Sequence, residues 1–280
     1  MRKLAIQRKG GRNTYGGTEL DWIHINSFDF LDDGNSLVLS SREQSSILKI
    51  KNIYTKPELD YVIHRGTIYN GTDIAKYQLK REGDFVANAG QHMITVEYDD
   101  SLPEGQYYLY MFNNNYGKAT SIPTFDWSMY PNVGNFKSGT SYYSKFLVDE
   151  KTRTYKLAQQ FSLPYSAIVS SVQHLGGNIP FSSGMSKIFG EYDKDGKLIK
   201  SFEYEADKLA EGIDILTMLV DSKLCTTRSD ARRMVQQGGV SVNGKKVDAI
   251  DATFGKADFD DKDRILLKKG KKKFCQIKEK

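Results

Sequence analysis

The chain has 280 residues, with 40 Lys and Arg against 35 Asp and Glu, and a formal net charge of +5. The excess lies at one end, because residues 206–280 carry 17 basic and 12 acidic side chains whereas residues 1–205 carry 23 of each. All 17 tyrosines and both tryptophans precede residue 205. Two compositions in one chain predict two domains, 1–205 and 206–280. No apolar run is long enough for a membrane span or a secretory signal, so the sequence as written predicts a cytoplasmic location.

Residues 21–205 are rich in Tyr, Phe, Ile and Val and are interrupted by Gly, Asn and Asp, which predicts strands. A strand–turn–strand pattern recurs around Gly34, Gly105 and Gly177, which lie 71 and 72 residues apart. Near-equal spacing of such units is typical of propeller blades. The sequence therefore predicts a mainly β fold, with a partial β-propeller of about three blades in residues 1–205. Open blade edges are expected to favour self-association.

Two of the four histidines stand in comparable places in this repeat. His24 and His92 each open a repeat ahead of its turn, at the strand end that points towards the axis of a propeller. Together with Asn26 and Arg42 they would form a site for an oxyanion, in which histidine supplies a nucleophile or acid and the other two supply donors. His174 aligns with Phe30 in the repeat, a packing position, and the sequence indicates no partner for His64. No set of residues has metal-ligand spacing and no phosphate-binding loop is seen, so neither a metal nor a cofactor is expected.

The last 75 residues change character. Thr227 followed by Asp230 predicts the start of a helix over residues 228–237. Asn243-Gly244 between alternating valines predicts a hairpin with a type I′ turn. A final strand is expected over residues 264–267, followed by a lysine-rich run. The tail is therefore predicted to be a small α+β domain.

Basic side chains in this tail gather on the predicted helix and at the hairpin. A cationic helix face beside hairpin lysines is typical of phosphate binding, and a merely solvated basic surface is the alternative. The candidate contacts are Arg228, Arg232, Arg233, Lys245 and Lys246.

The string Ser229-Asp-Ala-Arg232-Arg233-x-x-Gln-Gln-Gly238-Gly-Val-Ser-Val-Asn243-Gly resembles the C-terminal domain of bacterial tyrosyl-tRNA synthetases. The resemblance covers about residues 207–280. It implies binding of structured, tRNA-like RNA, with the five basic residues as phosphate contacts. It does not imply a ligase, because the nucleotide-binding motifs of that class are absent from the sequence.

A second resemblance covers about residues 18–205. Asp21-Trp-Ile-His24-Ile-Asn26-Ser27 and Ser40-Ser-Arg42-Glu-Gln-Ser-Ser-Ile47 resemble bacterial arylsulfotransferases, as does Gln91-His92 followed by Phe112-Asn113-Asn114, where Asn113 replaces the usual Asp. The resemblance implies sulfuryl transfer from a phenolic sulfate donor to a phenol acceptor, with His92 as the nucleophile that becomes a sulfohistidine. His24, Asn26 and Arg42 would line the active site.

The two resemblances leave two function classes open. The first class is a transferase. The first domain resembles only the later blades of its family, so it is either an active transferase or a truncated, inactive propeller. The family is typically exported, whereas the sequence as written predicts a cytoplasmic location. The alternative is a non-enzymatic RNA-binding protein, whose front part is a carrier. A natural fusion and a chimaeric or mis-joined chain are equally compatible with the sequence.

Overall fold

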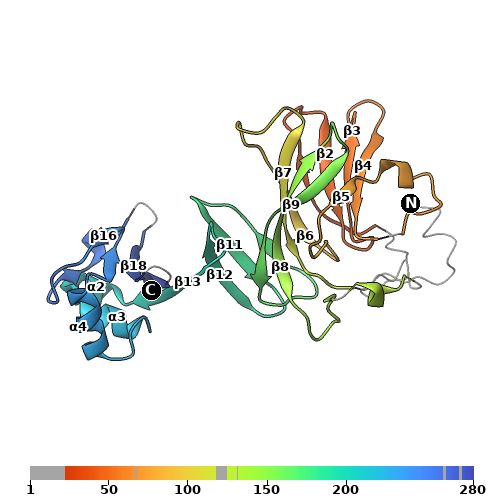
Figure 1. Ribbon diagram of the computed structural model, residues 1–280. Coiled ribbons are helices and arrows are strands. Elements are labelled where there is room, and N and C mark those ends of the chain that lie inside the picture. Colours follow the sequence, from red (N-terminus) through yellow and green to blue (C-terminus); the bar gives the residue numbers. More distant parts are fainter. Residues whose placement is uncertain (1–22, 67, 118–124, 131, 261–262, 271–272) are drawn as a thin grey trace. The chain divides into compact units, whose positions relative to one another are not determined.

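The computed structural model describes residues 23–66, 68–117, 125–130, 132–260, 263–270 and 273–280 (Figure 1). The chain divides into two compact units. The first unit comprises Met1–Gln173 and Phe181–Phe189, and the second comprises His174–Pro180 and Gly190–Lys280. The fold is mainly β, as predicted.

The first unit begins with a four-stranded antiparallel meander in the order β1-β2-β3-β4. Strands β2 and β3 carry consecutive apolar residues, and both of their faces are buried. Val38 and Ile47 belong to one apolar cluster and Leu39 and Leu48 to another, which is the pattern of strands covered on both sides. The strands are β1 (Ile25–Phe30), β2 (Ser36–Ser41), β3 (Ser46–Lys51) and β4 (Glu58–His64).

A second meander follows, and its five-stranded sheet has the order β5-β9-β8-β7-β6. Strands β6 to β9 pair antiparallel in sequence order, and the short β5 adds in parallel to the outer edge of β9. The strands are β5 (Lys80–Glu82), β6 (His92–Glu97), β7 (Gln106–Asn113), β8 (Ser141–Asp149) and β9 (Thr154–Leu163). Short 3-10 helices are η1 (Ala75–Tyr77) and η2 (Trp127–Met129).

The repeated glycines occupy equivalent turns. Gly34 connects β1 to β2, Gly105 precedes β7 in the connection from β6, and Gly177 lies between β10 (Ser171–Val172) and β11 (Asn178–Ser183). Their φ angles are 61°, 85° and 81°, a left-handed conformation that glycine adopts without a Cβ clash. The repeat found in the sequence therefore corresponds to the first two strands of successive antiparallel sets. The number of blades stays a prediction.

The core of the first unit lies between its two meanders. Buried Val38, Ile47 and Ile63 from the first sheet belong to one cluster with buried Leu109 and Phe146 from the second. Burial of large aliphatic and aromatic side chains stabilises such a pair of sheets by about 1.5–3 kcal/mol for each side chain. This packing holds the loop before β6 against the first meander.

The second unit has a mixed sheet and three short helices. Strands β12 (Ile188–Asp193) and β13 (Leu198–Tyr204) pair antiparallel, and the sheet continues in the order β13-β19-β18-β15-β16. Its other strands are β15 (Val240–Val242), β16 (Lys245–Lys246), β18 (Ile265–Lys269) and β19 (Lys273–Glu279), and β14 (Ile213–Asp214) pairs with β17 (Thr253–Phe254). The helices are α2 (Ala206–Glu211), α3 (Ile215–Asp221), α4 (Arg228–Gln236) and the 3-10 turn η3 (Lys256–Asp258).

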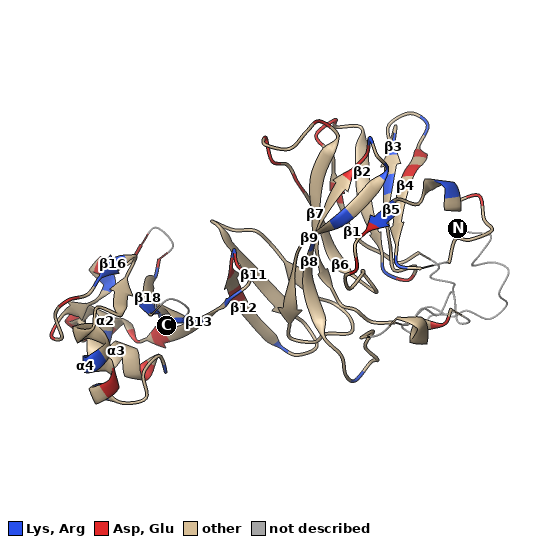
Figure 2. Ribbon diagram, viewed as in Figure 1, with Lys and Arg blue, Asp and Glu red and all other residues tan. Residues whose placement is uncertain are grey.

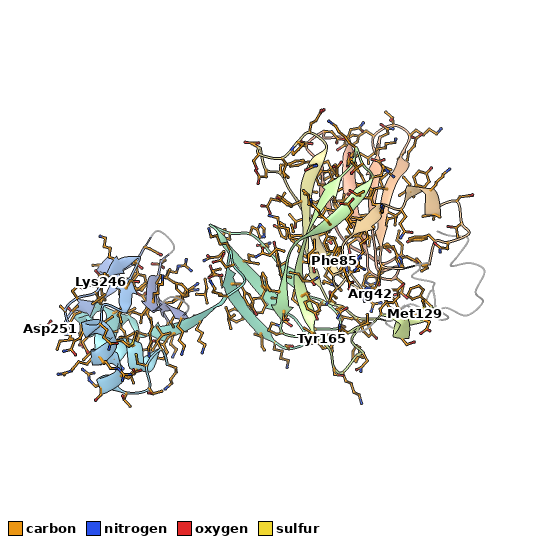
Figure 3. The ribbon with its side chains drawn as sticks, viewed as in Figure 1. Arg42, Phe85, Met129, Tyr165, Lys246 and Asp251 are labelled. Carbon is orange, nitrogen blue, oxygen red and sulfur yellow. The ribbon has the colours of Figure 1, made fainter. Side chains whose placement is uncertain are left out.

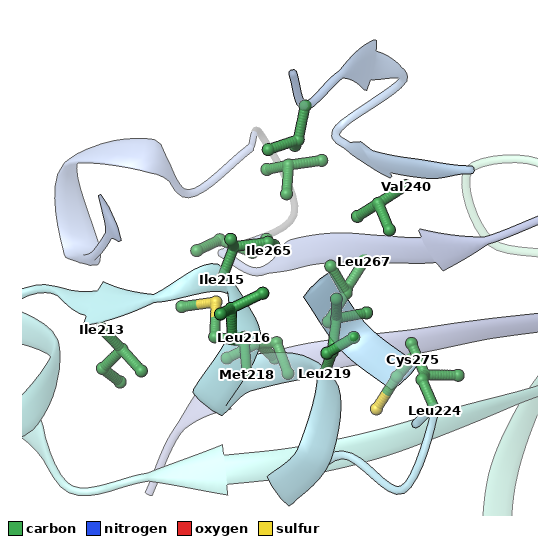
Figure 4. Packing of buried hydrophobic residues seen from close by; sticks show 14 of the residues in the cluster. Ile213, Ile215, Leu216, Met218, Leu219, Leu224, Val240, Ile265, Leu267 and Cys275 are labelled. Atoms are coloured by element: carbon green, nitrogen blue, oxygen red, sulfur yellow. The ribbon is translucent and has the colours of Figure 1, made fainter. Parts of the chain in front are cut away.

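Local signals in the tail match its structure. Thr227 caps α4 by accepting a hydrogen bond from the backbone N–H of Asp230 at 3.1 Å. Asn243 and Gly244 have φ angles of 48° and 80°, so both central residues of the hairpin turn are left-handed, as a type I′ turn requires. The buried face of α3 and α4 packs on the sheet in one apolar cluster, part of which is drawn in Figure 4.

The strand predicted over residues 264–267 is not the final one, because a further strand follows the lysine-rich run. Residues Lys273–Glu279 form strand β19, which pairs antiparallel with β18 and parallel with β13. Three consecutive residues of this strand are buried, Cys275, Gln276 and Ile277, as expected for a strand paired on both sides. Strand β13 lies before the predicted boundary at residue 206, and the boundary itself stays a prediction.

Among the described residues, no helix combines the length and the apolar character needed to cross a bilayer.

Candidate functional site

The four predicted catalytic residues come from the starts of β1 and β6 and the end of β2. His24 directly precedes β1, Asn26 lies on it, Arg42 follows β2 and His92 opens β6. The backbone N–H of Arg42 donates to the carbonyl of His24 at 3.0 Å. The side-chain amide of Asn26 donates to the carbonyl of Gln91 at 2.8 Å. The structure thus connects His24 with Arg42, and Asn26 with the residue that precedes His92.

The imidazole of His92 is held by acceptors on one side and a donor on the other. Its Nδ1 lies 2.7 Å from Oδ1 of Asn114 and 3.1 Å from the carbonyl of Gly90. Asn114 donates from Nδ2 to the carbonyl of Ser166 at 2.8 Å, which turns its Oδ1 towards the histidine. Because both partners of Nδ1 are acceptors, the proton resides on Nδ1. The lone pair is then on Nε2, which accepts a hydrogen bond from the backbone N–H of Val169 at 3.2 Å.

Electrostatics keep this imidazole neutral. Burial, with a smaller contribution from the charge of Arg42, lowers the pKa of His92 to about 4, while the hydrogen bonds to Asn114 and Gly90 act in the opposite direction. A histidine with this pKa is unprotonated at neutral pH. His92 therefore combines a fixed tautomer with an available electron pair, which are the two properties a nucleophilic imidazole needs.

Arg42 is fully buried and is paired with its own neighbour. Its Nη1 lies 2.7 Å from Oε2 of Glu43, and neither side chain is exposed to solvent. The guanidinium carbon lies 5.3 Å from the centre of the Tyr116 ring, within range of a cation–π interaction. Figure 3 labels Arg42 within the first unit. A buried guanidinium of fixed orientation can contribute a planar set of donors to an oxyanion.

Gln91 fixes the backbone next to the histidine. Its side-chain amide is fully buried and donates to Oγ of Ser40 at 3.1 Å and to the carbonyl of Ser46 at 3.0 Å. Its Oε1 accepts from Asn88 at 3.1 Å. With the bond from Asn26 to its carbonyl, Gln91 ties β6 to the first meander. A residue whose side-chain amide and carbonyl are all hydrogen-bonded restricts the position of the residue that follows it.

Sequence reasoning missed the roles of Asn114 and Gln91. Both stood inside motifs that were noticed, Gln91 next to the histidine and Asn114 at the end of β7. The pairing of His92 with Phe112 across β6 and β7 brings Asn114 near the imidazole. This register, and the β-bulge between His92 and Thr95, depend on how the two strands pair. The spacing of residues along the sequence does not predict them.

Another histidine is buried outside this site. His64 accepts at Nδ1 from the backbone N–H of Gly66 at 2.9 Å and contacts the rings of Tyr69 and Phe125 edge-on. Burial lowers its pKa to about 4. The sequence had indicated no partner for this histidine, and the structure shows that these partners come from the segments that follow it.

The five predicted RNA contacts lie on exposed parts of α4 and the hairpin of the second unit (Figure 2). Three take part in surface ion pairs: Arg228 with Asp214 at 3.0 Å, Arg233 with Asp230 at 2.9 Å, and Lys246 with Asp248 at 2.8 Å. Exposed pairs of this kind contribute about 0–1 kcal/mol, so a phosphate can displace the carboxylate. Arg232 and Lys245 form no ion pair with any residue in the described ranges.

The hairpin and α4 adjoin each other. A Cβ placed on Gly238, just beyond the end of α4, would lie 2.4 Å from Cε of Lys246. The Lys246 side chain, labelled in Figure 3, therefore lies against the end of the helix. The cations of α4 and of the hairpin thus belong to neighbouring parts of one small domain.

The fold and the site define a protein of antiparallel β-meanders with a buried histidine–arginine centre, followed by a small basic domain. The chain belongs to the arylsulfotransferase (ASST) family, whose family model matches residues 2–220. A second family model, the tyrosine–tRNA ligase SYY-like C-terminal domain, matches residues 198–277. The chain therefore joins an arylsulfotransferase domain to a tyrosyl-tRNA synthetase-like C-terminal domain.

Curated relatives match the tail. The chain is 51% identical over 71 residues to the tyrosine–tRNA ligase of Lachnoclostridium phytofermentans, and the match covers 25% of this chain and 17% of that ligase. It is 43% identical over 70 residues to the Treponema denticola ligase, with the same shares. The chain thus spans about a sixth of the length of these relatives. A solved Bacteroides fragilis structure, provisionally described as a 6-phosphogluconolactonase, aligns with TM-score 0.36 and 12% identity over 63% of this chain and 37% of that chain.

Proposed function

We propose that the first domain transfers a sulfuryl group from an aryl sulfate to a phenol through a covalent intermediate on His92. The observation that supports this most directly is the hydrogen bond between Nδ1 of His92 and Asn114. It leaves the lone pair of a neutral imidazole on Nε2. Membership of the arylsulfotransferase family supplies the substrate class.

The reaction would proceed by double displacement. Nε2 of His92 forms a bond to sulfur, the bond between sulfur and the aryl oxygen breaks, and the electron pair leaves on a phenolate that takes a proton from protonated His24. In the second step the oxygen of the acceptor phenol bonds to sulfur, the nitrogen–sulfur bond breaks and its electrons return to Nε2. The proton of the phenol passes to His24, which restores the starting state.

Two donors would stabilise the sulfuryl oxygens during both steps. Arg42 would contribute its guanidinium, and Asn26 would contribute the second N–H of an amide whose first N–H is bound to Gln91. Donors placed where charge develops act strongly in a buried site, because little solvent screens them. The hydrogen bond from the backbone N–H of Val169 to Nε2 would have to break before sulfur bonds to that nitrogen.

The test is identification of the modified residue. The protein is exposed briefly to 4-nitrophenyl sulfate at neutral pH without acceptor, and the sulfated peptide is identified by mass spectrometry. We expect the label on His92, its loss in His92→Ala, and its retention in the control His174→Ala. Release of 4-nitrophenolate with phenol as acceptor should disappear with the label. A label on another residue, or full transfer by His92→Ala, would refute the assignment.

We also propose that the second domain binds structured RNA through phosphate contacts. This is supported by five exposed cations on α4 and the adjoining hairpin, in a domain similar to the tail of tyrosyl-tRNA synthetases. If the transferase assay fails while RNA binding persists, the function reduces to that of an RNA-binding protein with a carrier region. The two assays thus separate the two candidate functions.

A further inference from the structure

A cavity of about 390 Å³ lies in the first unit, and the described residues that line it do not include the four assigned to catalysis. Its lining combines two arginines with aromatic and apolar side chains. Figure 3 labels two of the lining residues, Phe85 and Met129. The cavity is lined by Arg65, Arg81, Asp84, Phe85, Val86, Ala87, Met129, Tyr130 and Asn132.

Arg65 brings a buried positive charge to this cavity. The residue is 8% exposed, and it forms no ion pair with a carboxylate among the described residues. Its Nη2 donates to the carbonyl of Ala87 and, at 3.1 Å, to Oδ1 of Asn115. Its Nη1 has no hydrogen-bond partner in the part of the chain that the structure describes. A buried charge with only neutral partners is costly, and proteins usually pair it with an opposite charge.

A second guanidinium increases this excess of positive charge. Arg81 also lines the cavity, and the two arginines are close enough that Arg81 contributes to lowering the pKa of Arg65, after the larger effect of burial. Arg81 donates from Nε to Gly83 and from Nη2 to Asp84 and Phe85. Asp84 is fully exposed, so its compensation of this charge is screened by solvent.

Each guanidinium group makes a cation–π contact with an aromatic ring of the cavity. The guanidinium carbon of Arg81 lies 4.3 Å from the centre of the Phe85 ring, and that of Arg65 lies 5.5 Å from the centre of the Tyr130 ring. These contacts restrict the orientation of the two guanidinium groups. Together with Met129 the rings also give the cavity an apolar side. Oriented guanidinium groups bind oxyanions through parallel hydrogen bonds.

We infer that this cavity is a second ligand site that binds a tetrahedral oxyanion, free or as the head group of a small aryl ester, between Arg65 and Arg81. The anion would compensate the buried charge of Arg65 and accept a hydrogen bond from its Nη1, which has no partner among the described protein atoms. Phe85, Met129 and Tyr130 would contact the aryl group when one is present. The inference does not depend on the proposed transferase reaction.

Trp127 provides a local reporter, because its ring centre lies 6.5 Å from that of Tyr130. The chain has two tryptophans, Trp22 and Trp127, so the variant Trp22→Phe isolates this signal. Fluorescence of the full chain in that background is titrated with sodium sulfate, and separately with phenyl sulfate, against sodium chloride at matched ionic strength. We expect a saturable response specific to one or both sulfur oxyanions.

Three variants locate the response. Arg81→Gln, at a partly exposed residue, should weaken binding by about tenfold, the loss expected for a charge-assisted hydrogen bond. Lys56→Gln removes an exposed positive charge elsewhere in the same unit and should leave the dissociation constant unchanged. His92→Ala should also leave it unchanged, which separates this cavity from the proposed catalytic site.

The outcomes are distinct. Saturation by inorganic sulfate would identify a free oxyanion as sufficient, and saturation by phenyl sulfate alone would identify the ester as the ligand. The absence of any response beyond that of chloride would overturn the inference. So would a response that Arg81→Gln retains in full or that His92→Ala abolishes.

Discussion

Oδ1 of Asn114 lies 2.7 Å from Nδ1 of His92, and the opposite end of the Asn114 amide is bound to the carbonyl of Ser166. The asparagine therefore fixes the tautomer of the imidazole without adding charge. Asn114→Ala should lower kcat about 10- to 100-fold, the range known for groups that orient metal-bound histidines, with little change in KM. Steady-state kinetics of aryl sulfate transfer measure both constants.

Asn114→Asp tests the electrostatic part of this arrangement. A carboxylate at this position would favour the imidazolium and raise the pKa of His92 from about 4. Because only the neutral imidazole attacks, the acidic limb of the pH–rate profile should move to higher pH than in the parent protein. An unchanged acidic limb in the Asp variant would mean that His92 is not the titrating group.

Two buried histidines should make the first unit sensitive to acid. Burial lowers the pKa values of His64 and His92 from 6.5 to about 4. Between these pH values the unfolded chain binds the proton and the folded chain does not, so the free energy of unfolding falls as pH drops from about 6.5 towards 4. The contribution is roughly 3 kcal/mol per histidine at most. Urea unfolding followed by fluorescence at several pH values measures the slope, which His64→Gln should reduce.

The buried pair Arg42–Glu43 predicts a coupled effect on stability. Arg42→Met leaves the buried carboxylate of Glu43 without this partner, which typically costs about 3–5 kcal/mol. Adding Glu43→Gln removes that charge and should recover a large part of the loss. A double-mutant cycle by chemical denaturation measures the coupling energy. Additive effects of the two substitutions would show that the pair does not act as a unit.

RNA binding by the tail should depend strongly on salt. Arg232→Glu combined with Arg233→Glu should weaken binding by about 1–3 kcal/mol per contact and lower the slope of log K against log salt by roughly one per contact. Fluorescence anisotropy with a labelled tRNA measures both quantities. Lys208→Glu, an exposed substitution on α2, is the matched control. Binding that is unchanged in the double variant at low and moderate salt would contradict the assignment.

A fragment of residues 206–280 should be less stable than one of residues 190–280. The shorter fragment lacks β13, which pairs with β19 from Lys200↔Cys275 to Tyr204↔Glu279. It also lacks Tyr204, a buried member of the apolar cluster whose hydroxyl donates to Asp221 at 2.9 Å. Losing a buried aromatic side chain costs about 3–5 kcal/mol, and the open edge of β19 invites association. Denaturation and sedimentation measure the difference, and equal behaviour of the two fragments would count against it.

Features with a local cause could be predicted from the sequence. The cap at Thr227, the turn at Asn243-Gly244 and the three turn glycines each depend on the conformational preference of one or two residues. The mainly β character follows from composition and turn spacing in the same way. These elements require no knowledge of distant contacts.

Features that depend on strand register could not be predicted. Strand β19 was not predicted because lysines dominate the sequence before it. The burial of its central residues depends on pairing with β13 and β18, which lie on either side of it. The contact of Asn114 with His92 needs the bulge in β6 and the position of the loop before Ser166. Likewise, Arg65 and Arg81 line one cavity, but no sequence motif contains either residue, so their proximity could not be predicted.

Strand β13 pairs with β12 on one side and with the C-terminal strand β19 on the other. It also lies in the segment 198–220 that both family models match. The junction between the two homologous regions is therefore a shared secondary-structure element and not a linker. Any natural or engineered exchange of the tail must supply a new terminal strand with matching alternation, because a replacement domain that is complete in itself would leave β13 unsatisfied along one side.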